Sequence, residues 1–221
     1  MKKLTIVSIA LLLSAISFGQ KIQVHEASED IGSGKNNALI VTVYGTEESD
    51  LEHDWKSLMK DYGAKVSSVK GGGMKAENAT IKDISTKPID VYVRFDVKKD
   101  GIEVVVAFDL GGAYLSSSAH ADKYKVAEKI LHDFGVKETS GAINDKLKVQ
   151  QKALDKMNSQ EKDLEKDNKN LNSDIEDYQN KIKKAQDNIV KNKDEQAKKQ
   201  TEISNQTKVV DELAKKAKDV Q

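Results

Sequence analysis

The chain has 221 residues, and its 36 Lys and Arg residues balance 36 Asp and Glu residues. This neutrality argues against a nucleic-acid partner, because proteins that neutralise phosphates carry a basic excess. The absence of cysteine from the sequence excludes disulfides, thiolate metal sites and thiol catalysis. We therefore expect that the chain binds no nucleic acid and that its folded part is held together by its hydrophobic core alone. The sequence also offers no catalytic constellation, so we predict a non-enzymatic chain that uses no cofactor.

The N-terminus has the features of an export signal. Two lysines precede an apolar stretch over 4–13, and Ser17 and Gly19 provide small residues for a cleavage site. This pattern predicts that residues 1–19 form a signal peptide and that the mature chain begins at Gln20. The apolar stretch is too short to span a bilayer with ease. We therefore expect an exported protein, periplasmic or extracellular, that is not an integral membrane protein after cleavage.

A small α+β head domain is predicted over residues 20–140. It opens with an apolar run of strand type over 38–44, which precedes an amphipathic helix. Either Ser49 or Asp50 is expected to cap this helix, and Gly63 is expected to end it. The apolar residues that recur at helical spacing on its one face are Leu51, Trp55, Leu58 and Tyr62.

A β-hairpin is the clearest feature of the head domain. Apolar and polar residues alternate over 91–97 and again over 102–110, which predicts strands with one buried and one wetter face. Between them, Asp100 and Gly101 form a dipeptide that is typical of two-residue hairpin turns.

Shorter elements complete the predicted domain. A short strand is expected over 66–69, a glycine turn over 71–73, and a longer strand over 74–84. A second helix is expected after the N-cap Ser118 and is expected to stop at Gly135. Its apolar face comprises Ala127, Ile130, Leu131 and Phe134. This order of elements predicts a small antiparallel sheet with helices packed on one face.

The remainder, residues 141–221, is predicted to be a long coiled coil. After Gly141 it contains neither Gly nor Pro, and apolar residues recur at alternating steps of four and three from Ile143 onward. Heptads that stay in phase over such a length are typical of paired helices. We predict an oligomerisation seam that contains the following residues: Leu147, Leu154, Leu164, Leu171, Ile175, Ile182, Ile189, Ile203, Val210 and Leu213.

The sequence alone does not decide which helix packs against this seam. An isolated helix of this polarity is not stable in water, so the seam must meet another copy or fold back on itself. Ile at a positions and Leu at d positions favour a parallel homo-oligomer of two or three chains. The alternative is an intrachain hairpin, whose turn would lie in the polar segment 192–199, although that segment lacks Gly and Pro.

One segment of the head resembles a ligand site. Residues 108–120 combine a strand end, the Gly111-Gly112 turn, three serines and a helix start, where backbone amides are able to cradle an anion. The segment lacks the ending of a phosphate-binding loop, so a plain connector is the preferred interpretation. The four histidines, none at metal-ligand spacing from another, are His25, His53, His120 and His132.

The chain as a whole resembles uncharacterised secreted proteins of the Bacteroidota, which have a small α+β head and a C-terminal coiled coil. The resemblance rests on the Ser-Phe-Gly-Gln export end, on residues 78–81, 91–93 and 108–118, and on the long helix rich in Lys, Glu and Asp. It implies a bacterial source and an exported compartment, and it implies no activity.

These observations favour an exported structural or interaction protein of the cell envelope. The head would bind or anchor, the coiled coil would oligomerise or act as a spacer, and the expected partners are further copies of the chain and an envelope protein. The alternative is a periplasmic holdase-like chaperone with projecting helical arms. An enzyme or small-ligand-binding module that uses the Gly111-Gly112 loop is the third hypothesis.

Overall fold

The computed structural model describes residues 21–70 and 72–219 and divides the chain into two compact units. The first unit ends at Gln150 and the second begins at Gln151, within one helix that runs through both. The predicted signal peptide lies outside the described residues.

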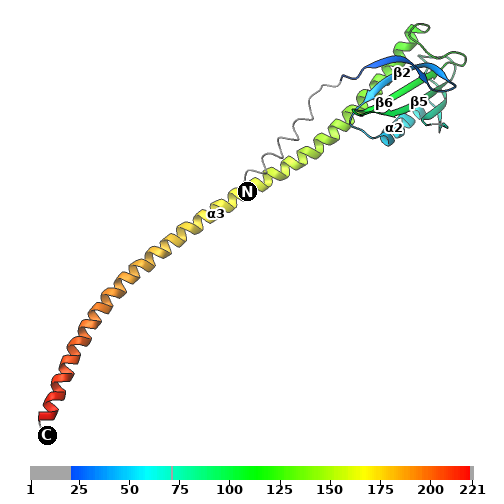
Figure 1. The fold of residues 1–221 in the computed structure, drawn as a ribbon. Coiled ribbons are helices and arrows are strands. Elements are labelled where there is room, and N and C mark those ends of the chain that lie inside the picture. The colour runs from blue at the N-terminus through cyan, green and yellow to red at the C-terminus, as the bar shows by residue number, and fades with distance from the viewer. Residues whose placement is uncertain (1–20, 71, 220–221) are drawn as a thin grey trace. The chain divides into compact units, whose positions relative to one another are not determined.

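The first unit is built on a six-stranded antiparallel sheet in the order β1-β2-β6-β5-β4-β3. Figure 1 labels its neighbouring strands β2, β6 and β5. The helices of this unit are α2 (Glu48–Asp61) and the N-terminal part of α3 (Ala121–Asp219). The prediction of an α+β fold with an antiparallel sheet and a long C-terminal helix is therefore confirmed. The strands are β1 (Val24–Asp30), β2 (Lys35–Val43), β3 (Lys65–Ser68), β4 (Met74–Ala79), β5 (Ile89–Val97) and β6 (Ile102–Asp109).

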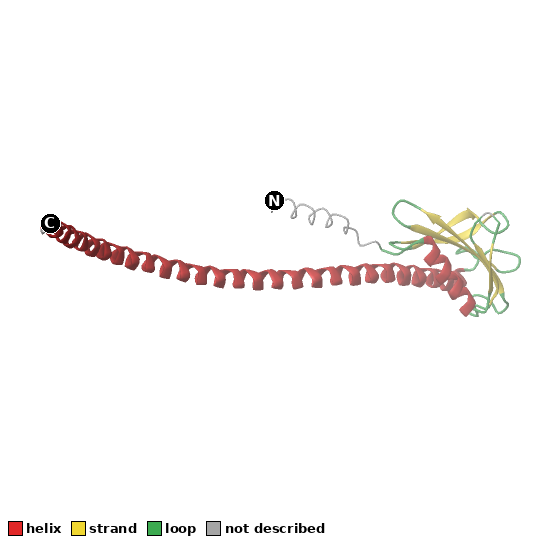
Figure 2. Cartoon of the chain, turned by 90° about the horizontal axis from the view of Figure 1, so that it is seen from below, coloured by secondary structure: helices red, strands yellow, loops and turns green. Residues whose placement is uncertain are grey.

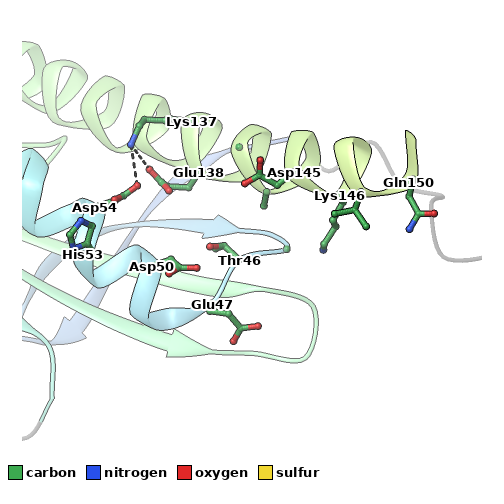
Figure 3. Close-up of a pocket in the computed structure, with 14 residues that line it drawn as sticks. Thr46, Glu47, Asp50, His53, Asp54, Lys137, Glu138, Asp145, Lys146 and Gln150 are labelled. Carbon is green, nitrogen blue, oxygen red and sulfur yellow. Dashed lines mark hydrogen bonds and ion pairs between the residues drawn. The ribbon is translucent and has the colours of Figure 1, made fainter. Parts of the chain in front are cut away.

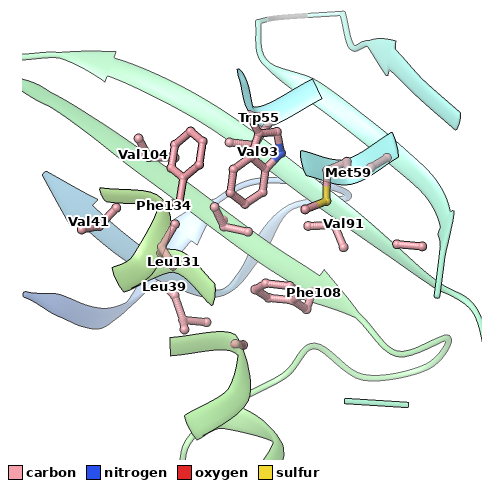
Figure 4. Close-up of a cluster of buried hydrophobic side chains, with 14 of the residues drawn as sticks. Leu39, Val41, Trp55, Met59, Val91, Val93, Val104, Phe108, Leu131 and Phe134 are labelled. Carbon is pink, nitrogen blue, oxygen red and sulfur yellow. The ribbon is translucent and has the colours of Figure 1, made fainter. Parts of the chain in front are cut away.

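The main core lies between the sheet and the two helices, which cover the same face (Figures 2 and 4). Trp55 of α2 and Phe134 of α3 meet edge to face, with ring centroids 5.2 Å apart. Beneath them lie the alternating residues of the central strands, including Val91, Val104 and the fully buried Phe108. The period-two pattern therefore identified the correct inner face of the hairpin.

The opposite face of the sheet carries a second, smaller core that the sequence did not predict. Ile31, at the tip of the β1–β2 hairpin, packs with Ile40 and Val105 from the outer sides of β2 and β6. Arg94 of β5 donates hydrogen bonds to the Asp30 carbonyl and the Glu29 carboxylate, at 2.7 and 2.9 Å. The hairpin tip therefore covers the middle of the outer face, which we had expected to be wetter.

Two details of the head differ from expectation, and a third agrees with it. The strand predicted over 74–84 ends at Ala79, because Asn78 has a positive φ of 60° and a turn over 81–84 follows. Helix α2 begins after Glu47 without a side-chain cap, so neither Ser49 nor Asp50 caps it. Gly63 does end the helix, with φ +78°.

The β5–β6 turn differs by one residue from the expected one. Val97 pairs with Ile102, and the Lys98 N–H donates to the Gly101 carbonyl at 2.9 Å. Lys99 and Asp100 are thus the central residues, rather than Asp100 and Gly101. A Cβ on Gly101 would lie 2.6 Å from the carbonyl oxygen of Val43, so this glycine is explained by close approach to β2.

Gly135 does not end a helix, and this prediction was wrong. Helix α3 continues through it and through residue 140 without a break. A Cβ on Gly135 would lie 2.9 Å from Val41 Cγ2 and 3.0 Å from Ile22 Cγ2. The glycine therefore allows the helix to approach the sheet closely, which is a packing role rather than a stop signal.

The second unit, taken by itself, is the continuation of α3 from Gln151 to Asp219. It is helical throughout, including the segment 192–199. A fold-back at that segment is therefore not present within the described residues. The coiled coil itself stays a prediction, because it requires a second helix and the described residues of this unit form α3 alone.

Candidate interaction surfaces

An exposed apolar stripe runs along α3. Apolar residues at a and d positions, three to four residues apart, lie on one side of a helix. Leu154 is 50% exposed and Leu164 is 65% exposed, which is unusual for side chains of this size. All ten residues of the predicted seam are exposed: Leu147, Leu154, Leu164, Leu171, Ile175, Ile182, Ile189, Ile203, Val210 and Leu213.

Polar residues interrupt this stripe at a few seam positions. Near the middle of the second unit, Asn192 accepts a hydrogen bond from Gln196 at 2.6 Å, and Lys199 pairs with Glu202 at 2.5 Å. These contacts join residues three or four apart on the same helix, so they stabilise α3 locally.

The loop around Gly111 and Gly112 closes on itself. Asp109 accepts the Gly111 N–H at 2.9 Å, and Gly111 has φ +85°. The loop ends where the Leu115 N–H donates to the Phe108 carbonyl at 2.9 Å. Helix α3 begins only at Ala121, so Ser118 is not its N-cap.

The chain supplies its own anion to the serine segment that follows this loop. The Glu26 carboxylate of β1 accepts hydrogen bonds from both the backbone N–H and the hydroxyl of Ser117, and from Asn37 Nδ2 at 2.6 Å. Burial acts to raise the pKa of Glu26, but these hydrogen bonds outweigh it and lower the pKa below its ordinary value. The structure therefore favours the connector interpretation of the segment.

Sequence reasoning missed this Glu26 cluster. Its acceptor lies on β1, for which no strand was predicted, and it meets Ser117 across 91 residues of chain. The local pattern around the serines indicated an anion-binding arrangement, but nothing in it pointed to residue 26. Only the pairing of β1 with β2 places Glu26 and Asn37 together.

A groove of about 710 Å³ lies between α2 and α3 within the first unit (Figure 3). Lys137 of α3 bridges the two helices, with its Nζ 3.3 Å from Asp54 and 2.8 Å from Glu138. Burial raises the pKa of the Glu138 carboxyl despite this lysine. Five carboxylates line the groove, and three of them, Asp54, Glu138 and Asp145, already pair with lysines of the chain. We interpret the groove as the boundary where α2 packs against α3.

Two of the four histidines lie at one pocket, which His25 of β1 and His132 of α3 line together with Lys129 and Asp133. His53 of α2 lies elsewhere and is exposed, and His120 accepts a 3.4 Å hydrogen bond from the Ser116 N–H. Over residues 21–70 and 72–219, no cluster of three or more His, Asp or Glu side chains is able to hold a metal ion. Within the same residues, every helix is too short or too polar to cross a membrane.

Comparisons with protein-family models, with curated proteins and with solved structures found no match to this chain. The resemblance to secreted proteins of the Bacteroidota therefore stays a prediction. Among the α3 stripe, the Glu26 cluster and the groove between α2 and α3, the exposed stripe is the most extensive.

Proposed function

We propose that the chain is an exported, non-catalytic protein of the cell envelope whose α3 helix associates with further copies of itself. The observation that carries the proposal is the apolar stripe on α3, whose large side chains are half exposed or more. Monomeric proteins seldom expose contiguous apolar surface of this extent, and such surfaces are typical of interaction sites.

The stability of α3 supports a partner for the second unit. Over the described residues 151–219, the helix has no other element of its own unit to pack against, and most of its residues are polar. Helices in water owe most of their stability to tertiary packing of an apolar face rather than to propensity. A second helix on the stripe would provide that packing.

The first unit supports the proposal that the head binds or anchors while the tail associates with further copies. It has its own apolar core and its own sheet, so it is able to present a binding or anchoring surface at one end of the tail. The leader predicted over 1–19 supports export. The holdase hypothesis would require the stripe to bind unfolded chains rather than its own copies.

Sedimentation velocity on residues 20–221 tests the proposal. The wild-type chain should sediment as an oligomer, and Ile182→Asp should sediment as a monomer because it places a charge in the seam. Asn180→Asp is the matched control, since it adds the same carboxylate at an f position outside the seam. Near-ultraviolet circular dichroism should show an unchanged first unit in both variants.

A monomeric wild-type chain that suppresses the aggregation of an unfolded client would replace this proposal with the holdase hypothesis. Export is tested separately, by mass spectrometry of the protein recovered from the envelope fraction of the source bacterium. The mature N-terminus should be Gln20, and an intact Met1 would contradict export through this leader.

A further inference from the structure

Four of the seven polar residues of the seam form pairs of opposite or matching character, and the other three are Gln150, Gln196 and Gln206. Glu161 and Asn168 occupy a positions, and Asn192 and Lys199 occupy d positions. In a parallel, in-register pair each residue meets its own copy. Glu161 would then face Glu161 and Lys199 would face Lys199, and two like-charge pairs inside a seam are costly.

An antiparallel pair removes both conflicts. In this orientation an a residue lies opposite a d residue of the second copy. The alignment centred on residue 180 places Glu161 opposite Lys199 of the second copy, and two-fold symmetry generates this ion pair twice. Unlike charges therefore replace like charges at both positions.

The same alignment produces three further matches, and it places Gln150, Gln196 and Gln206 opposite Val210, Leu164 and Leu154. Asn168 lies opposite Asn192, so two amides that are able to hydrogen-bond each other share one layer. Leu147 lies opposite Leu213. On the flank of the seam, Glu165 lies near Lys193, and these are the only charged residues at e positions between 151 and 214.

Neighbouring alignments do not produce these matches. A shift of one heptad places Lys199 opposite Leu154 in one direction and opposite Asn168 in the other, and Glu161 loses its basic partner in both. The centred alignment does bring some like charges together at g positions, such as Asp167 and Glu195. Those side chains lie on the solvated flank, where repulsion is screened and weaker than inside the seam.

The stripe is large enough for a stable pair. Each large apolar side chain contributes roughly 60–100 Å² when it is covered. Thirteen such seam residues are exposed between Ile143 and Leu213, which amounts to roughly 800–1,300 Å² per chain. A standard specific interface buries about 800 Å² per partner.

We infer that α3 pairs with a second copy of this chain as an antiparallel two-stranded coiled coil, centred near residue 180. The inference rests on the proposed self-association, and the charge pattern outweighs the Ile and Leu preference for a parallel pair. Since each first unit joins its tail at residue 150, the two units join the pair at opposite ends.

Cysteine cross-linking of the full mature chain distinguishes the orientations, because the natural sequence contains no cysteine. Asn168→Cys and Asn192→Cys are prepared singly, unfolded and refolded alone or as a mixture, and treated with a short bis-maleimide. The antiparallel pair should cross-link in the mixture only, because equivalent residues of one variant lie about 36 Å apart along the axis. Cross-linking of either variant alone would establish a parallel pair and overturn the inference.

Sedimentation of the same samples separates the two proposals. Dimers that fail to cross-link in any sample would overturn the antiparallel alignment while leaving self-association intact. Monomers in every sample, wild type included, would overturn self-association itself.

A charge exchange provides a second, independent test. Glu161→Lys alone and Lys199→Glu alone should each weaken the dimer at least about tenfold, because each creates two like-charge contacts across the seam. The double variant should return to within about threefold of the wild-type dissociation constant. Lys198→Glu, at a c position outside the seam, is the matched control. If the double variant lost as much dimer affinity as the two single variants lose together, the pairing of Glu161 with Lys199 would be contradicted.

Discussion

At the scale of single residues, adjacent positions on β6 differ sharply in what they contribute. Phe108 is fully buried in the main core, whereas Asp109, the half-buried last residue of β6, accepts one hydrogen bond from the Gly111 N–H. Phe108→Ala should lower the free energy of unfolding by about 3–5 kcal/mol, because it leaves a cavity in a packed core. Asp109→Ala should lower it by less than about 1 kcal/mol. Urea melts of the two variants check this ranking. A larger loss of stability for Asp109→Ala than for Phe108→Ala would contradict the burial of Phe108 in the core.

The Glu26 carboxylate predicts a pH dependence of stability. Its pKa in the folded protein is lower than its ordinary value of 4.5, so its stabilising contribution is complete above that value and is lost as the pH falls through the folded pKa. Glu26→Gln should therefore cost about 1 kcal/mol near pH 7, a figure discounted for partial solvent exposure.

This difference between wild type and Glu26→Gln should shrink towards zero once the pH lies below both pKa values. Urea melts of the pair at several pH values measure it. The comparison isolates Glu26 from the other carboxylates, because both proteins retain them. A constant difference at every pH would show that the hydrogen bonds to Ser117 and Asn37 do not depend on the charge.

At the scale of elements, two glycines of α3 should respond in opposite ways to the same substitution. Gly141→Ala should raise the free energy of unfolding by about 0.5–1 kcal/mol, because nothing lies within 4 Å of the new Cβ and alanine favours the helix. Gly135→Ala should lower it by about 1 kcal/mol, because the new Cβ would clash with Val41 and Ile22. The cost of this clash exceeds the stability that alanine adds to the helix. Thermal melts of both variants test the packing role of Gly135, and a stabilised Gly135→Ala would refute it.

Sequence periodicity predicted the elements whose apolar residues face one core. The β5–β6 hairpin and α2 followed their periods of two and 3.6, and Phe108 and Trp55 lie inside as the spacing indicates. β1 escaped prediction because its sequence, VHEASED, is an edge strand whose polar residues form hydrogen bonds rather than an apolar face. Gly135 was misread because a helix stop and a close helix–sheet contact both require a glycine, and only the contact with Val41 distinguishes them.

The candidate surfaces also differ in whether the sequence could predict them. The exposed stripe on α3 consists of residues that are near one another in sequence, so its members could be identified in advance, whereas its role as a seam stays a prediction. The Glu26 cluster joins β1 to a loop that lies 91 residues later, and its formation depends on strand register. Such a site is not visible in any local window of sequence.

At the scale of the whole molecule, the central claim is that α3 is stabilised by another copy of the chain. An interchain contact is governed by mass action, so helicity and melting temperature should rise with protein concentration. A helix stabilised within its own chain would show neither dependence.

The most direct measurement is thermal unfolding of residues 20–221, followed by circular dichroism at a helical wavelength across a hundredfold dilution. The helical transition of the tail should move to lower temperature at each dilution, and Ile182→Asp should melt early at every concentration. A wild-type transition that stays at one temperature across the whole series would contradict self-association along α3.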